Sequence, residues 1–207
     1  MVISMVAGLS IGITNSKTYE KIAFQREQVV KSSLELVFPQ GLNIEERRGS
    51  GKLPDRYWVA VSEQGIEGYA FEVSSRGYSS DIRFMAGVFT DGTITGITIL
   101  DQRETPGLGS RVSEVASENY LWTALFKSSP QSLPWFTEQF RGITVFDPIG
   151  VEKSLGEWHS LNTEKRKMLK ENNQITAITG STISTDAVIN GLKLTIAGYL
   201  QELARKK

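Results

Sequence analysis

A hydroxyl-rich segment near the C-terminal end of the chain is the first place where side chains could bind a ligand. From Gln174 to Thr185, six of 12 residues carry a hydroxyl group, and Gly180 lies among them. Apolar residues then recur at helical spacing and predict a helix over residues 186–204, with Ser184 or Thr185 placed to cap its first amides. The six hydroxyl residues are Thr176, Thr179, Ser181, Thr182, Ser184 and Thr185.

A helix N-terminus of this composition favours an anion. Free amides and the positive end of the helix dipole attract a phosphate, and hydroxyl donors replace the lysine that other sites use. No Gly-Lys-Ser/Thr sequence follows, which excludes a Walker loop. Two interpretations remain open for the segment alone: a phosphate site, or a Ser/Thr-rich loop that only caps a helix.

The second segment is Glu104-Thr105-Pro106-Gly107-Leu108-Gly109. Its two glycines allow the backbone to adopt positive φ and to approach a flat or bulky group closely, while the proline stiffens the entry. Taken alone, the hexamer is equally a strand-to-helix loop without a ligand.

The composition restricts the chemistry further. The chain has 207 residues, 23 basic and 23 acidic side chains, no cysteine and one histidine, His159. Zero net charge argues against nucleic-acid binding. Without cysteine there is no disulfide, thiolate-bound zinc or iron–sulfur cluster, and one histidine excludes a multi-histidine metal site. Any redox function therefore requires an organic cofactor, and no metal site or catalytic acid–base group is expected.

The elements that must position the two segments predict an α+β domain. Four runs rich in β-branched and aromatic residues predict strands, and Asp91-Gly92 between the last two predicts a two-residue hairpin that pairs Phe84–Phe89 antiparallel with Ile94–Ile99. Helical periodicity marks four later stretches. Strands followed by helices, without regular alternation, are typical of an antiparallel sheet with packed helices. The strand runs are 57–62, 68–74, 82–90 and 93–100; the helical stretches are 110–126, 135–140, 160–170 and 186–204.

The N-terminal residues differ from the rest. Residues 1–15 are uncharged and mostly apolar. A helix of this length is roughly 22 Å long, short of the ~30 Å hydrocarbon core of a bilayer. We interpret them as part of a membrane anchor, with a buried or exchanged apolar helix as the alternative. Residues 16–38 predict an amphipathic helix that stops at Pro39-Gln40-Gly41, so residues 16–207 form the predicted domain.

Taken together, the two segments resemble a known family. The sequence DGTITGITILDQRETPGLGSRV, followed by ITAITGSTISTDAVINGLK, is similar to the FMN-binding domain family, in particular the G subunit of Rnf-type electron transport complexes and the related C subunit of the sodium-pumping NADH:quinone reductase. The resemblance extends over nearly the whole chain, from the apolar N-terminus through VFPQG, the GYSSDIRFMAGVFTDGTITG hairpin and WFTEQFRG.

The resemblance implies a cofactor and its residues. In that family FMN is held covalently through a phosphoester to the last threonine of a motif like Asp-x-x-Ser/Thr-Gly-Ala/Ser-Thr. Thr179-Gly180-Ser181-Thr182 occupies this motif, so Thr182 is implied to carry FMN, and Thr176 stands where the family has aspartate. Ser184 and Thr185 would join the phosphate end. The residues implied to lie against the isoalloxazine ring are Glu104, Thr105, Gly107, Leu108 and Gly109.

It also implies a role. The chain resembles an electron-carrier flavoprotein subunit of a membrane-bound, ion-translocating complex, matured by a separate flavin transferase. The family's location would be the bacterial cytoplasmic membrane, with a single span and the soluble domain on the extracytoplasmic side. Two alternatives remain: a stand-alone reductase with noncovalent FMN, and a flavin-free assembly scaffold.

Other conspicuous residues are interpreted as structural. We expect His159 at the surface or at a helix cap, and the charged run 165–167 on a solvated helix face. Aromatic residues are expected in the core or at an interface, with one of them possible at the flavin. They are Trp122, Phe126, Trp135, Phe136, Phe140 and Trp158.

Overall fold

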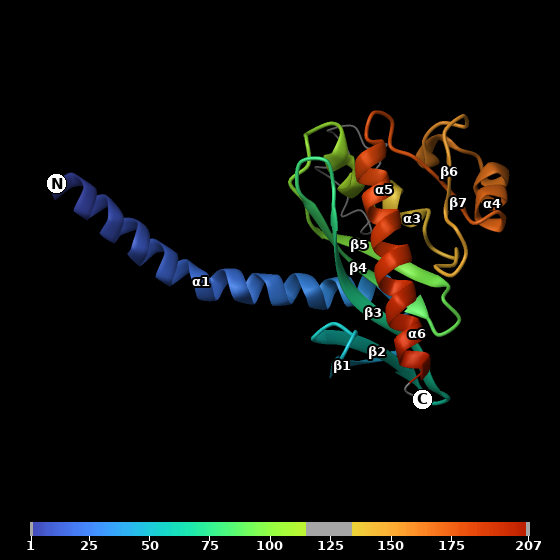
Figure 1. Cartoon of the computed structure of the whole chain (residues 1–207), viewed down its shortest axis with the longest axis horizontal. Helices are drawn as coiled ribbons and strands as arrows, with labels where there is room; N and C mark the ends of the chain where they lie inside the picture. Colours follow the sequence, from blue (N-terminus) through green and yellow to red (C-terminus); the bar gives the residue numbers. More distant parts are fainter. Residues whose placement is uncertain (1, 115–133, 206–207) are drawn as a thin grey trace, which may run out of the picture.

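The computed structural model describes residues 2–114 and 134–205. Its centre is a five-stranded sheet in which every neighbouring pair is antiparallel and the spatial order follows the chain (Figure 1). The α+β prediction is confirmed, and the four predicted strands lie where the alternation placed them. The strands are β1 (Asn43–Arg48), β2 (Arg56–Ser62), β3 (Gly65–Arg76), β4 (Asp81–Phe89) and β5 (Ile94–Asp101).

The predicted hairpin joins β4 and β5, but its loop is longer than two residues. Phe84 pairs with Ile99 and Val88 with Ile94, with register shifts beside both. Phe89 N donates to Thr93 O at 2.8 Å, and Gly92, at φ +87°, donates to Phe89 O at 3.0 Å. Three residues, 90–92, therefore form the loop, an arrangement in which the glycine takes the left-handed position.

Each face of the sheet is covered by a different part of the chain. Alternation along β2 sends Tyr57 and Val59 to one face and Trp58 and Ala60 to the other. The C-terminal helices cover the first face, which carries the larger core. The end of helix α1 (Val2–Val37) covers the second, where Val30, Leu34 and Val37 pack against Trp58, Ala60, Ala70 and Met85.

Helix α1 is longer than either predicted piece. It runs without interruption across the predicted boundary at residues 15 and 16, ends at Val37 before the predicted stop, and extends away from the sheet over its N-terminal half (Figure 1). Within the described residues, no helix combines the length and the apolar character that a membrane crossing requires.

The C-terminal helix begins four residues earlier than predicted. It consists of α5 (Thr182–Asn190), a π-helical segment (Gly191–Ile196) and α6 (Ala197–Arg205). Ser181 occupies the N-cap position, and no side chain caps the helix there. The prediction that Ser184 or Thr185 is the cap is therefore wrong, because both lie inside the first turn and bond elsewhere.

Short elements complete the domain beside the sheet. Most of the predicted helix over residues 110–126 lies outside the described residues, and only a 3₁₀ turn (Gly109–Ser113) is described there. Three-residue strands β6 (Gly150–Glu152) and β7 (Gln174–Thr176) pair in parallel. The remaining elements are α3 (Trp135–Glu138), a 3₁₀ turn (Trp158–Ser160) and α4 (Thr163–Glu171).

The packing of the C-terminal helix on the sheet predicts opposite effects at two of its glycines. A Cβ at Gly191 would lie 2.8 Å from Phe84 Cζ and 3.0 Å from Val73 Cγ1, whereas a Cβ at Gly198 meets nothing within 4 Å. Gly191→Ala should lower the free energy of unfolding by about 1–3 kcal/mol through overpacking. Gly198→Ala should raise it by up to about 1 kcal/mol through helix propensity. Urea unfolding followed by circular dichroism measures both; equal effects would contradict this packing.

Candidate functional site

Three segments that are distant in sequence meet at the carboxylate of Glu104, which is 5% exposed. Its Oε1 accepts hydrogen bonds from the amides of Ser79 and Ser80, both at 2.9 Å. Its Oε2 accepts from the amide of Tyr78 at 3.1 Å and from the hydroxyl of Ser184 at 2.6 Å. The β3–β4 turn, the loop after β5 and the first turn of α5 are thus joined through one side chain.

Hydrogen bonding keeps this carboxylate ionised. Burial alone raises the pKa of Glu104, but the Ser184 hydroxyl and the three amides outweigh burial and hold the pKa below its ordinary value. The two glycines next to it are needed for space. A Cβ at Gly109 would lie 2.5 Å from both Glu104 Oε2 and Ser184 Oγ, and one at Gly77 would lie 2.7 Å from Glu104 Oε1.

A second connection joins the same two predicted segments. Arg111 follows the glycine loop and donates to both carboxylate oxygens of Glu157, each at 2.7 Å. Glu157 Oε1 in turn accepts from the amide of Thr179 at 2.9 Å. Burial raises the pKa of Glu157, but bonds from Arg111 and Thr179 dominate and lower it to about 2. Arg111 and Glu157 could not be singled out from the sequence, because nothing local marks them as partners.

Four of the six hydroxyl groups in the Thr/Ser segment make hydrogen bonds inside the domain, and all four belong to buried side chains. Thr176 bonds Gln139, Ser181 donates to Ser184 at 2.9 Å, and Ser184 donates to Glu104. Thr185 donates to Ser181 O at 3.1 Å and accepts from the amide of Ile178. Thr179 and Thr182 are the exposed members of the six. Thr179 lies beside Glu157, which accepts from its amide, whereas the hydroxyl of Thr182 has no hydrogen-bond partner in the described chain.

The backbone beside this hydroxyl is also free to bind. Thr182 is the first residue of α5, and the amides of Thr182, Ile183 and Ser184 have no acceptor in the described chain. Such amides at a helix N-terminus, together with the helix dipole, attract an anion. The structure therefore places one exposed hydroxyl without a hydrogen-bond partner beside three free donors.

Exposed apolar side chains belong to each of the three segments that meet at Glu104. The side chain of Tyr78 in the β3–β4 turn is 69% exposed, that of Leu108 in the glycine loop is 44% exposed, and that of Ile183 in the first turn of α5 is 52% exposed. A Cβ at Gly180 would lie 3.2 Å from Leu108 Cδ2, so the loop tip lies against the Thr/Ser segment. Gly107, at φ +74°, has open space around its Cα. Tyr78 was not singled out from the sequence because Gly-Tyr-Ser-Ser indicates only a turn.

Comparison with known proteins identifies the family. The model of the FMN-binding domain matches residues 77–197, which is more than half of the chain and includes all three segments at Glu104. The chain belongs to the FMN-binding domain family. The family model begins at Gly77, the glycine that packs against the Glu104 carboxylate.

Similar proteins agree with this membership. The chain is 28% identical to the G subunit of the Na⁺-translocating ferredoxin:NAD⁺ oxidoreductase complex of Acetobacterium woodii, over 96% of this chain and 87% of that protein. It is 26% identical to the G subunit of the ion-translocating oxidoreductase complex of Methanosarcina acetivorans, over 93% and 86%. The crystal structure of Shewanella oneidensis NqrC shares the fold, with a TM-score of 0.51 and 13% identity over 84% of this chain and 74% of that one.

The residues present fit the FMN of this family. A flavin mononucleotide has a phosphate end and a flat, largely apolar ring end. The free amides and hydroxyl at Thr182 match the first, and the exposed side chains of Tyr78, Leu108 and Ile183 beside the open Gly107 match the second. The assignment of individual residues to the ring remains a prediction. Glu104 and Gly109 are buried, so any contact they make with the ring competes with their internal contacts.

Thr176, which stands where the resemblance implies an aspartate, is fully buried. Its amide donates to Gln139 Oε1 at 2.8 Å, and Gln139 Nε2 donates back to Thr176 O at 3.1 Å. The paired amide fixes the backbone three residues before Thr179. A protein that recognises the motif from outside cannot contact this side chain in the folded domain.

The remaining predicted residues have structural surroundings. Trp135, Phe136, Phe140 and Trp158 are buried in the core, as predicted. His159 is exposed, its ring lies 5.0 Å from that of Trp135, and its Nδ1 lies 3.7 Å from Glu157 Oε2. Trp122 and Phe126 lie outside the described residues. Among the described residues, no group of three or more histidine, aspartate or glutamate side chains could hold a metal.

The depressed pKa of Glu157 predicts a pH-dependent contribution to stability. The stabilisation is complete above the ordinary pKa of 4.5 and is lost as the pH falls toward the folded pKa of about 2. Glu157→Gln should therefore cost about 2 kcal/mol at pH 6 and progressively less toward pH 3. Urea unfolding at several pH values measures the difference from wild type.

A matched control is Glu171→Gln, which removes an exposed carboxylate paired with Lys167 at 3.7 Å. It should change the free energy of unfolding by less than about 0.5 kcal/mol at any pH. A difference between wild type and Glu157→Gln that is the same at pH 6 and pH 3 would show that the ion pair is not the cause.

Proposed function

We propose that this protein is an electron-carrier flavoprotein that holds FMN through a phosphoester to Thr182. One observation carries the proposal: of the two exposed hydroxyl groups in the motif segment, that of Thr182 lies at the helix N-terminus without a hydrogen-bond partner, whereas Thr179 lies beside the Glu157 carboxylate. A hydroxyl can be esterified only where it is accessible, and a carboxylate repels a phosphate that approaches it. Burial of four hydroxyl groups and the charge beside the fifth therefore favour attachment at Thr182.

The protein's own groups would serve the two ends of the cofactor differently. The amides of Thr182, Ile183 and Ser184 would donate to the phosphate. Tyr78, Leu108 and Ile183 offer apolar and aromatic surface to the ring, with Thr105 and Gly107 along the loop. FMN, when bound, supplies one- and two-electron chemistry, so the chain needs no catalytic acid or base of its own.

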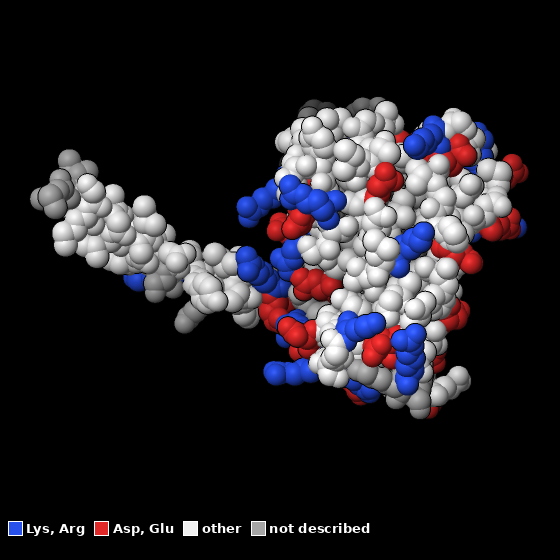
Figure 2. Space-filling view, in the orientation of Figure 1, with Lys and Arg blue, Asp and Glu red and all other residues white. Residues whose placement is uncertain are grey.

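The cellular setting follows from relatives and from α1. Proteins that are similar to this chain over more than nine-tenths of its length are named as G subunits of ion-translocating oxidoreductase complexes. This similarity supports a role as a subunit of such a complex. In the N-terminal half of α1, Met5, Leu9, Ile11 and Ile13 are exposed apolar residues, and Figure 2 shows this half almost free of charge. We infer that residues 1–15 belong to a single-pass anchor in the bacterial cytoplasmic membrane and that residues 16–207 form an extracytoplasmic domain matured by a flavin transferase.

Acid precipitation distinguishes this function from the alternatives. A covalent flavin stays in the pellet and gives it a yellow colour. A stand-alone reductase with noncovalent FMN would release the flavin to the supernatant, and a flavin-free scaffold would give neither. The protein must come from cells that export it and contain a flavin transferase.

Removing the unbonded hydroxyl should abolish attachment. Thr182→Ala should contain no covalent FMN while its circular dichroism and unfolding free energy stay close to wild type, because the lost hydroxyl makes no internal hydrogen bond and the side chain is exposed. Thr182→Ser, which keeps the hydroxyl, should retain flavin. Mass spectrometry of tryptic peptides locates the adduct, and flavin found on Thr179 or Ser184 in the wild type would refute the assignment.

A side chain at the loop tip should disturb the ring without removing it. Gly107→Val introduces a branched residue at φ +74°, at a cost of roughly 1–2 kcal/mol, into the open space where the ring is expected. Covalent FMN should persist, while the visible absorption band, flavin fluorescence and reduction potential shift together.

Gly142→Val is the matched control, since Gly142 has φ +88° and equally open surroundings. Gly142 lies at the opposite end of β5 from the glycine loop. Its amide donates to Ile94 O at the start of the strand, whereas the glycine loop follows the strand's end. The control should carry similar backbone strain and a wild-type flavin spectrum. Wild-type spectra and potential in Gly107→Val would place the loop away from the ring.

A further inference from the structure

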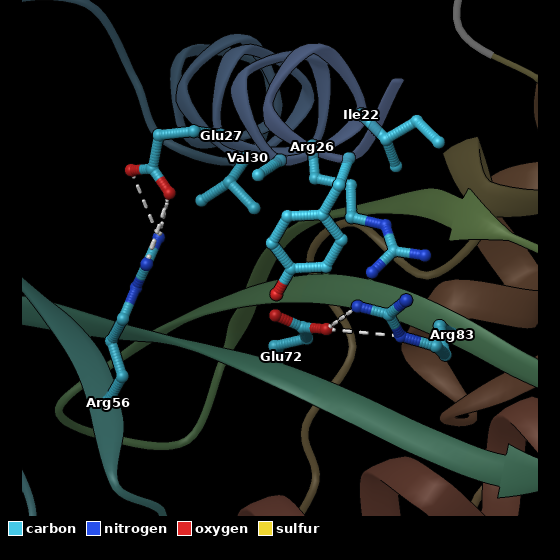
Figure 3. A pocket seen from close by; sticks show the side chains of 9 residues that line it. Ile22, Arg26, Glu27, Val30, Arg56, Glu72 and Arg83 are labelled. Atoms are coloured by element: carbon cyan, nitrogen blue, oxygen red, sulfur yellow. Dashed lines mark hydrogen bonds and ion pairs between the residues drawn. The ribbon is translucent and has the colours of Figure 1, made fainter. Parts of the chain in front are cut away.

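A pocket of about 290 Å³ lies where α1 leaves the sheet, on the face opposite the C-terminal helices (Figure 3). Ile22, Ala23 and Val30 of α1 form its apolar wall. The volume is near the lower end of the range of about 300–1,000 Å³ that small-molecule sites occupy. No part of the proposed flavin site lines this pocket.

The charged side of the pocket follows from strand alternation. Arg56, Glu72 and Arg83 lie two residues from Trp58, Ala70 and Met85, respectively, and so share their face of the sheet. The apolar residues lie under the packed end of α1, and the charged ones lie where the helix departs. The adjacent strands β2, β3 and β4 therefore each contribute one charged side chain to the pocket.

Two of the three arginines that line the pocket are paired. Arg56 donates to Glu27 at 3.1 Å and also pairs with Glu46 at 3.4 Å, and Arg83 donates to Glu72 through Nε at 3.1 Å and through a second nitrogen. Arg26, the third guanidinium, has neither a hydrogen bond nor an ion pair within the part of the chain that the structure describes. Figure 3 shows its side chain descending from α1 toward Arg83 and Glu72.

We propose that this pocket binds a small organic monocarboxylate, with its carboxylate on Arg26 and its hydrocarbon part against Ile22, Ala23 and Val30. A guanidinium presents parallel donors that match a carboxylate. Ile22, 44% exposed, and the exposed Ala23 present apolar surface beside Arg26 that a short hydrocarbon chain can cover. Arg26 is the one lining arginine without a partner in the described chain, so the pocket offers free guanidinium donors for a single carboxylate. Glu27 and Glu72 repel a second negative charge, so phosphate and dicarboxylates are disfavoured.

Butyrate titration of the full-length wild-type protein tests the proposal directly. The readout is the arginine Nε–H signals in ¹H–¹⁵N NMR spectra at constant ionic strength. The Arg26 signal should shift saturably with butyrate, while succinate and inorganic phosphate bind more weakly. Arg26→Gln should weaken butyrate binding by about tenfold or more, the loss expected for one charged hydrogen-bonding partner.

Two further variants separate recognition from damage to the fold. Arg48→Gln removes an exposed arginine of β1 that also lacks an ion pair within the described chain, and it should bind butyrate as wild type does. Glu72→Gln should strengthen butyrate binding and admit succinate, because it removes the repelling carboxylate. A structural disturbance would produce loss in this variant, not gain.

The proposal is overturned if butyrate gives only a linear, unsaturable shift equal to that of chloride. It is also overturned if Arg26→Gln binds like wild type, or if Glu72→Gln binds butyrate less tightly. These measurements require no flavin, so they are independent of whether Thr182 is modified.

Discussion

The buried carboxylate of Glu104 is the constraint on which the candidate site depends. An ion removed from water must be compensated by hydrogen bonds, and here the compensation comes from the amides of residues 78–80 and from Ser184, 80 positions along the chain. Satisfying one charge therefore fixes the relative positions of the β3–β4 turn, the loop after β5 and the first turn of α5. The same requirement explains Gly77 and Gly109, since a side chain at either position would occupy the space of the carboxylate.

Internal bonding also determines which groups remain reactive. Glu157 and Arg111 hold the backbone at Thr179, Gln139 holds it at Thr176, and the interior hydroxyls bond one another or Glu104. Only Thr179 and Thr182 are left exposed among the six, and Thr179 lies beside the Glu157 carboxylate. For the proposed attachment at Thr182, selectivity would arise from the burial and bonding of neighbouring groups and not from activation of the chosen one.

Sequence patterns predicted the features that depend on nearby residues. The β4–β5 hairpin, the alternation of β2 to β5 and the two polar segments could all be predicted, because turn chemistry and periodicity are local. Strand β1, with four charged residues among six, is a strand only because it pairs with β2 at an exposed edge. The start of α5 was misplaced because Ser184 and Thr185, which have the types of capping residues, bond Glu104 and Ile178 instead. Glu157 and Arg111 were missed because their pairing spans 46 residues.

The continuity of α1 has a mechanical consequence. A helix advances 1.5 Å and turns about 100° per residue, so an unbroken helix transmits both displacement and rotation between its ends. The face that holds Val30, Leu34 and Val37 against the sheet therefore has a fixed angle, about the helix axis, to the side chains of the N-terminal half. A single inserted residue between the two halves would rotate the whole domain by roughly a quarter of a revolution about that axis while lifting it by little more than an atom's radius. The number of residues in the helix thus sets the direction in which the domain faces far more sensitively than it sets the domain's height.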